Sequence, residues 1–118
     1  MTETELAINA AVSAGKIIQS LRHSRLSVGI KESLRDVVTE VDVIAEKKII
    51  EILTSKEKIA VISEELGSGQ LLQQECWIVD PIDGTANFVA GNPNYCVSIG
   101  RLSKGRLSQG VVFVPTSK

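Results

Sequence analysis

The chain has 118 residues, of which 43% are hydrophobic, and its 13 basic and 14 acidic side chains leave a formal net charge of -1. This length and apolar content fit one domain with a core of modest size. Because the charges are interspersed, no basic stripe indicates nucleic acid or an anionic membrane as a partner. We therefore expect a single domain over residues 1–118.

The first residues do not have the features of a targeting segment. Glu3 and Glu5 stand where a signal peptide would carry positive charge, and no apolar run approaches the ~20 residues that span a bilayer. Cys76 and Cys96 are far apart in sequence and have no Cys-x-x-Cys spacing, which favours buried reduced thiols. These observations predict a cytoplasmic protein without a membrane partner.

Two amphipathic helices are predicted in the first half of the chain. Thr2-x-x-Glu5 has the spacing of a capping box, and apolar residues at helical spacing continue over residues 2–21. Thr39-x-x-Asp42 resembles a second helix start, and the apolar face that follows predicts a helix over residues 39–54.

Short apolar runs of strand type follow the two helices. They cover residues 59–62, 76–79, 95–102 and 107–114, and the turn at 103–106 between the last two is typical of an antiparallel hairpin. The order of helices and then strands predicts an α+β fold, a two-layer sandwich with two N-terminal helices packed on a largely antiparallel sheet.

Carboxylates follow two of these apolar runs. Asp80 and Asp83 come after the run 76–79, and Glu64 comes after the run 59–62. Magnesium prefers oxygen ligands and uses neither thiolate nor imidazole in such sites. An aspartate at the end of a rigid strand can bridge two metal ions about 3.5 to 4 Å apart, and Asp80 is the candidate for this position. The pattern predicts a magnesium site.

The residues between and after the two aspartates suit a phosphate ligand. Pro81 keeps the residue before it extended, and the sharp turn that follows could free the Ile82 carbonyl as a metal ligand. The amides of Gly84, Thr85 and Ala86, at a predicted helix start, are expected to bind phosphate oxygens. Metal ions and amides would then hold one phosphate from two sides.

Each of these features also has a simpler explanation. Asp-Pro and Asp-Gly are common turn dipeptides, so the segment 80–84 alone could be an ordinary surface turn. Glu64-Glu65 alone could be a solvated loop pair. Their joint occurrence after strand-like runs favours a functional site, because α/β-containing folds often place their sites at strand ends.

The segment Trp77-Ile-Val-Asp-Pro-Ile-Asp-Gly-Thr-Ala-Asn-Phe88 resembles the first signature of the inositol monophosphatase family, which are magnesium-dependent, lithium-sensitive phosphomonoesterases. The resemblance extends upstream through Lys31 and residues 36–42 and 63–65, and downstream through residues 97–100 and 110–115. It thus covers nearly the whole chain. It implies the N-terminal part of the fold shared by these sugar phosphatases.

The resemblance also implies specific metal ligands. Glu64, Asp80 and the Ile82 carbonyl would bind one magnesium ion, and Asp80 and Asp83 would contribute to a second. The amides of Gly84 and Thr85 would contact the phosphate. The implied reaction is hydrolysis of a phosphate monoester by in-line attack of metal-bound water.

Further roles follow from the same resemblance. Glu64 would orient the attacking water, with Thr85 and Asp42 forming a hydrogen-bonded pair that helps to activate it. Lys31 and Asp36 match a mobile loop near the site and receive supporting roles.

One part of the family pattern has no counterpart in this chain. Members of the family are longer, and their second half carries a Trp-Asp motif that completes the second metal site, whereas this chain has one tryptophan, Trp77, and no aspartate after Asp83. We therefore expect the N-terminal half of such an enzyme, with impaired activity by itself. Inositol phosphates, fructose bisphosphate, histidinol phosphate and phosphoadenosine phosphate all stay open as substrates.

An alternative function is a non-catalytic metal-binding module. Such a module would associate with a second copy, a complementary half or another protein through the apolar surface that a C-terminal half would otherwise cover. Light scattering would separate this alternative from a monomeric fragment of an enzyme.

Overall fold

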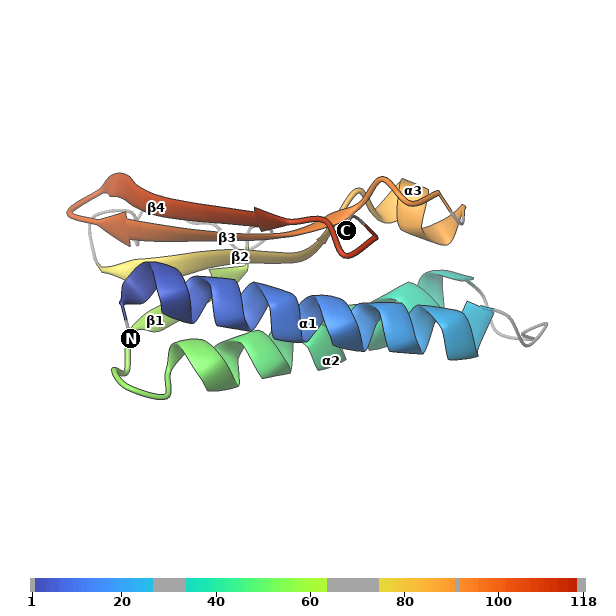
Figure 1. The fold of residues 1–118 in the computed structure, drawn as a ribbon, viewed down its shortest axis with the longest axis horizontal. Helices are drawn as coiled ribbons and strands as arrows, with labels where there is room; N and C mark the ends of the chain where they lie inside the picture. Colours follow the sequence, from blue (N-terminus) through green and yellow to red (C-terminus); the bar gives the residue numbers. More distant parts are fainter. Residues whose placement is uncertain (1, 27–33, 64–74, 91, 117–118) are drawn as a thin grey trace.

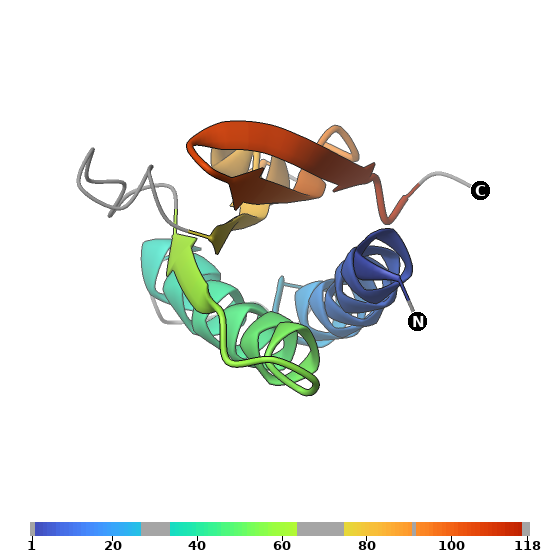
Figure 2. The same ribbon diagram turned by 90° about the vertical axis from the view of Figure 1, so that its left-hand side faces the viewer.

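The chain folds as two helices packed on one face of a four-stranded sheet (Figures 1 and 2). The computed structural model describes residues 2–26, 34–63, 75–90 and 92–116. The helices are α1 (Glu3–Leu26), α2 (Leu34–Leu53) and the short α3 (Thr85–Val89), and the strands are β1 (Ala60–Ser63), β2 (Cys76–Asp83), β3 (Cys96–Ser103) and β4 (Arg106–Phe113). The predicted α+β two-layer architecture is confirmed.

Helix α1 begins with the capping box that the sequence predicts. The amide of Glu5 donates to Thr2 Oγ1 at 3.1 Å, and the amide of Thr2 donates to Glu5 Oε1 at 3.3 Å. These two bonds satisfy donors that the first turn of a helix leaves without intrahelical partners. The helix continues past the predicted end at Leu21 to Leu26, because residues 22–26 contain neither Gly nor Pro to stop it.

The predicted start of the second helix at Thr39 is wrong. Helix α2 begins at Leu34, so the Thr39-x-x-Asp42 pattern lies inside the helix. Residues 34–38 contain neither Gly nor Pro, and a threonine alone does not end a helix that can continue. Asp36 therefore belongs to the first turn of α2 rather than to a loop, a position where the helix dipole favours negative charge.

The sheet has the strand order β1-β2-β3-β4, with β1 parallel to β2 and the two other pairs antiparallel. The predicted hairpin joins β3 and β4 through Lys104 and Gly105. Both residues have positive φ, 52° and 78°, as a two-residue turn of type I′ requires. The sheet is thus largely antiparallel, as predicted, with one parallel pair at its β1 edge.

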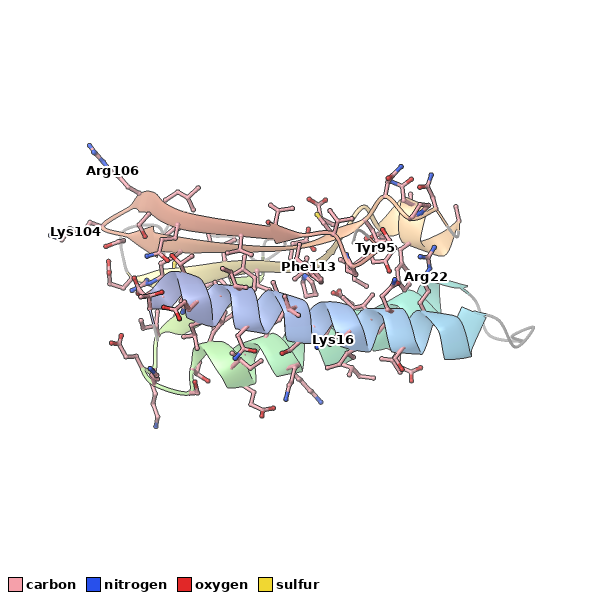
Figure 3. The ribbon with its side chains drawn as sticks, in the orientation of Figure 1. Lys16, Arg22, Tyr95, Lys104, Arg106 and Phe113 are labelled. Carbon is pink, nitrogen blue, oxygen red and sulfur yellow. The ribbon has the colours of Figure 1, made fainter. Side chains whose placement is uncertain are left out.

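The core lies between the helices and the sheet. Its largest fully buried side chains include Trp77, Phe88, Ile18 and Ile49. Helix α1 lies so close to β4 that a Cβ atom at Gly15 would overlap the ring of Phe113, which points from β4 toward α1 (Figure 3). A glycine at this crossing is what allows the helix to approach the strand.

The other face of the sheet carries no helix among the described residues (Figure 2). Asp80 and Ser98 lie on this open face, and the side chains of Leu107 and Val112 on β4 are each 67% exposed. Within the described ranges, no helix is long and apolar enough to cross a membrane.

Candidate functional site

The carboxyl end of β2 presents the two predicted aspartates. Asp80 is half-buried and pairs in register with Ser98, whereas Asp83 is exposed and pairs with Cys96. The register between these pairs is shifted by an irregularity in the strand, and Pro81 lies within it. Proline cannot donate to the ladder, so strand pairing is interrupted between the two carboxylates.

The pKa of the Cys96 thiol is affected by the charges of both aspartates. Its Sγ atom donates to Asp83 Oδ2 at 3.9 Å. Burial raises the pKa of this thiol, and the negative charges of Asp83 and then Asp80 raise it further. Two carboxylates near one strand end give this region negative charge, which suits a cation.

The carbonyl of Ile82 faces the start of α3. The side chain of Ile82 is buried, and its carbonyl accepts a hydrogen bond from Thr85 Oγ1 at 3.3 Å. A carbonyl oxygen has two lone pairs, so it can accept this bond and also bind a metal ion. Its predicted role as a ligand stays a prediction.

Gly84 is the residue that allows the chain to turn from β2 into α3. It has φ 94° and ψ 42°, in the left-handed region, and a Cβ atom here would lie 3.0 Å from the carbonyl oxygen of Asn94. The first intrahelical bond of α3 runs from the Phe88 amide to the Gly84 carbonyl at 3.0 Å. The amides of the exposed Thr85 and Ala86 therefore precede the hydrogen-bonded part of the helix.

Both aspartates border a concave surface. A depression of about 340 Å³ is lined by Asp83, Gly84, Asn94, Tyr95, Cys96, Val112 and Val114. A second one, of about 280 Å³, has Asp80 and Ser98 in its wall together with apolar residues of β3 and β4. A small ligand next to either carboxylate would thus lie against the open face of the sheet.

The other predicted site residues lie on α2 or outside the described residues. Asp42 is half-buried on α2, with its Oδ1 atom buried, and α2 packs against α3. The proposed pair between Asp42 and Thr85 stays a prediction. Glu64 and Lys31 lie outside the described residues, and Asp36 lies in the first turn of α2.

The structure contains a cluster around Arg22 that the sequence did not predict. The guanidinium of Arg22 lies over the rings of Phe88 and Tyr95, with its central carbon 5.3 Å and 5.0 Å from their centroids. Its Nη2 atom donates to the Asn92 carbonyl at 3.3 Å. These partners are more than sixty residues away in the chain, so no local pattern could have revealed them.

The donor set at the end of β2 fits a hard divalent cation. Asp80 and Asp83 supply carboxylate oxygens and Ile82 supplies a carbonyl, which are the ligand types that magnesium selects. The part of the chain that the structure describes contains no cluster of three or more His, Cys, Asp or Glu that could hold a metal ion. The third predicted carboxylate, Glu64, is not in that part, so the described residues supply only a portion of the ligand set.

The fold and the acidic end of β2 define an α+β domain with a candidate cation site. A sequence model of the inositol monophosphatase family matches residues 2–118. The chain therefore belongs to the inositol monophosphatase family.

Two curated relatives illustrate this membership. The chain is 40% identical to Nus factor SuhB of Pasteurella multocida over 114 residues, which is 93% of the chain and 42% of that relative. It is 40% identical to the inositol-1-monophosphatase of a Synechocystis species over 116 residues, which is 97% of the chain and 40% of that relative. The chain thus spans about two fifths of the length of these relatives.

Solved structures share the fold. The crystal structure of staphylococcal IMPase-II matches with a TM-score of 0.79 and 31% identity, covering 98% of the chain and 41% of that protein. CysQ from Bacteroides thetaiotaomicron, a bacterial member of the family, matches with a TM-score of 0.76 and 30% identity, covering 98% of the chain and 43% of that protein. The helices on a mixed sheet are therefore the family fold.

Proposed function

We propose that this chain forms the metal-binding and phosphate-binding part of a magnesium-dependent phosphomonoesterase. The observation that carries the proposal is the position of Asp80 and Asp83 at the end of β2, directly before the left-handed turn at Gly84. Gly84 then turns the chain so that exposed amides follow the carboxylates directly. Family membership agrees with a phosphatase.

Four residues would hold the metal ions. Asp80, Asp83 and the Ile82 carbonyl are the ligands in the described part of the chain, and Glu64 would join them. Bound magnesium would supply positive charge to the phosphoryl group and lower the pKa of a water molecule. The substrate would be a phosphate monoester of inositol or of a related sugar or nucleotide.

The protein groups would orient the reactants. The amides of Gly84, Thr85 and Ala86 would hold the phosphate oxygens, while Glu64, with Thr85 and Asp42, would orient the water and take its proton. The water oxygen would bond to phosphorus as the ester oxygen leaves, and that oxygen would then be protonated to an alcohol. This path needs no covalent enzyme intermediate.

Turnover by this chain alone is expected to be weak or absent. The chain spans about two fifths of its relatives, and the family pattern places a further metal ligand outside the matched part. Sensitivity to lithium and a cytoplasmic location are also part of the proposal. Phosphate release from inositol 1-phosphate with magnesium tests this expectation, and robust magnesium-dependent release would contradict it.

Metal binding tests the site itself. We expect Mg²⁺ to bind the wild-type chain in isothermal titration calorimetry, and D80N or D83N to weaken binding about tenfold or more, as loss of one charged ligand implies. The control is E57Q, because Glu57 is an exposed carboxylate in the turn between α2 and β1. Equal affinity in the wild-type chain, D80N and D83N would contradict the proposed site.

A second candidate function is an association module. The exposed Leu107 and Val112 on the open face of the sheet favour it, because exposed apolar side chains on one face mark interfaces. Some relatives are named Nus factors, a name that does not describe a phosphatase. Light scattering of the wild-type chain and of an L107S/V112S variant would test it, and a wild-type monomer would argue against self-association.

A further inference from the structure

The last turns of α1 reach the loop that follows α3. Arg22 is the contact: its guanidinium lies over two rings and donates to a backbone carbonyl in the same loop. The two rings, of Phe88 and Tyr95, are 0% and 2% exposed and meet edge to face with centroids 5.2 Å apart. Figure 3 shows Arg22 and Tyr95 close together between α1 and the segment after α3.

The same two aromatic residues flank the turn at Gly84. The Phe88 amide donates to the Gly84 carbonyl at 3.0 Å, and the Tyr95 Cα lies 3.4 Å from where a Cβ of Gly84 would be. Asn87 Nδ2 also donates to the Asn94 carbonyl at 2.8 Å, which ties α3 to the residue before Tyr95. The left-handed turn at Gly84 is thus held between α3, which carries Phe88, and the loop that carries Tyr95. Arg22 contacts both of these segments.

A planar guanidinium suits this position. It can lie on aromatic faces and donate a hydrogen bond in its own plane at the same time, whereas a lysine ammonium has no planar face to stack. Tyr95 is held from α1 a second time, because its hydroxyl donates to Gln19 Oε1. Helix α1 thus contacts the loop through Gln19 and Arg22.

We propose that Arg22 is a positioning residue that fixes the Asp83-Gly84 turn through Phe88 and Tyr95. Its importance for metal binding rests on the function proposed above, since Asp83 is a ligand only if that function is correct. The effect on the turn does not depend on that function. The contacts of Arg22 described above are with Phe88, Asn92 and Tyr95, so we assign its effect on the turn to the loop.

Amide exchange measured by NMR tests the effect on the turn. The variant R22M keeps most of the side-chain stem and removes the fork, and it should lower the protection of the Phe88 and Ala90 amides about tenfold, or ~1.4 kcal/mol. The amide of Ala90 donates to Ala86 at 3.0 Å within the same short helix. Protection of Val79 and Ile99 in the sheet should not change.

Two further variants separate charge from shape. R22K keeps the positive charge and loses the planar fork, so its protection should fall between wild type and R22M. K16M removes a cation from an exposed position on the same helix (Figure 3) and should behave as wild type. Equal loss of protection in the turn and in the sheet of R22M would make Arg22 a general stabiliser and overturn the proposal, as would unchanged protection.

Mg²⁺ titration of the same variants measures the consequence for the site. R22M should weaken Mg²⁺ binding about threefold to tenfold at a temperature where it is fully folded, because a mobile Asp83 must be ordered on binding. D83N should weaken binding without changing exchange at Phe88 and Ala90. If the wild-type chain binds no Mg²⁺, the proposed function fails, and the exchange result alone then decides whether Arg22 positions the turn.

Discussion

Acidic residues at the two ends of strand β2 have different surroundings. At its start, Glu75 accepts hydrogen bonds from Arg101 at 3.3 Å, from Ser103 Oγ at 2.9 Å and from the Lys104 amide at 2.9 Å. At its other end, Asp83 is exposed, and its Oδ2 atom accepts from the Cys96 thiol at the long distance of 3.9 Å. Nitrogen and hydroxyl donors thus surround Glu75, whereas the donor described at Asp83 is a thiol.

This difference separates a structural acid, Glu75, from the acid that we propose as a metal ligand, Asp83. Arg101, which is 4% exposed, also pairs with Glu3 of α1 at 2.7 Å and lies over the ring of Trp77. The buried guanidinium of Arg101 and the exposed carboxylates of Glu3 and Glu75 therefore hold helix, strand and hairpin together at the start of β2. At its end, Asp80 and Asp83 add negative charge where a cation could bind.

The largest expected effect comes from removing the cation at the start of β2. R101M should lower the free energy of unfolding by about 2 to 3 kcal/mol, because it leaves the carbonyls of Cys76 and Leu102 without this donor. Urea unfolding measures the change. The control R106M, at an exposed position in the hairpin, should change it by less than about 0.5 kcal/mol. Similar losses in the two variants would contradict the role of Arg101.

A smaller loss of stability is expected at the other end. G84A should lower the free energy of unfolding by about 1 to 2 kcal/mol, because alanine is strained at positive φ. The close carbonyl of Asn94 adds to this effect. G110A is the control, since no atom lies within 4 Å of a Cβ there, and it should be neutral or slightly stabilising. Chemical denaturation of G84A and G110A in parallel measures these two changes in the free energy of unfolding.

Acid should weaken the structural end of β2. The pKa of Glu75 is lowered in the fold, first because the Lys104 amide donates to it and then because Ser103 does. A carboxyl whose pKa is lowered by folding stabilises the protein above its unfolded value of about 4.3, and this contribution is lost as pH falls through the folded pKa. E75Q should therefore make stability less dependent on pH below about 4.3. A pH profile of E75Q that coincides with that of the wild-type chain would contradict this linkage.

The smallest effect on stability is expected from Asp83, the proposed metal ligand. D83N should change the free energy of unfolding by less than about 0.5 kcal/mol, as for other exposed positions. Thermal unfolding without magnesium measures this. With magnesium, the wild-type chain should gain stability that D83N lacks, because a ligand that binds the folded state stabilises it. A large loss of stability in D83N without metal would show that Asp83 is a structural acid as well.

The elements that could be predicted from the sequence are those set by local patterns. The capping box at Thr2, the hairpin turn at Lys104-Gly105 and the strand that leads to Asp80 all follow from residues within a few positions of one another. The start of α2 was missed because a Thr-x-x-Asp pattern does not show whether the helix continues upstream. Local patterns indicate where a helix can begin, and packing and the absence of breakers decide where it does.

The contacts that could not be predicted join distant parts of the chain. Arg101 and Glu3 are 98 residues apart, and Arg22 and Asn92 are 70 apart. In the candidate site, one sequence motif predicted the two aspartates and Gly84. It did not predict that the loop residues Asn94 and Tyr95 pack behind the turn at Gly84. Only the folded arrangement shows which residues support the motif.

The close crossing of α1 and β4 at Gly15 and Phe113 has a consequence for synthesis on the ribosome. Helix α1 emerges first, but its partners on the sheet include Gln109, which bonds to Thr4 across 105 residues, and Phe113. Until those residues leave the exit tunnel, α1 lacks its contacts with β4 and can pack only against α2 and β3. Closing such long loops slows folding. We therefore expect the nascent chain to complete the packing of α1 and α2 on the sheet only after the β3–β4 hairpin has emerged.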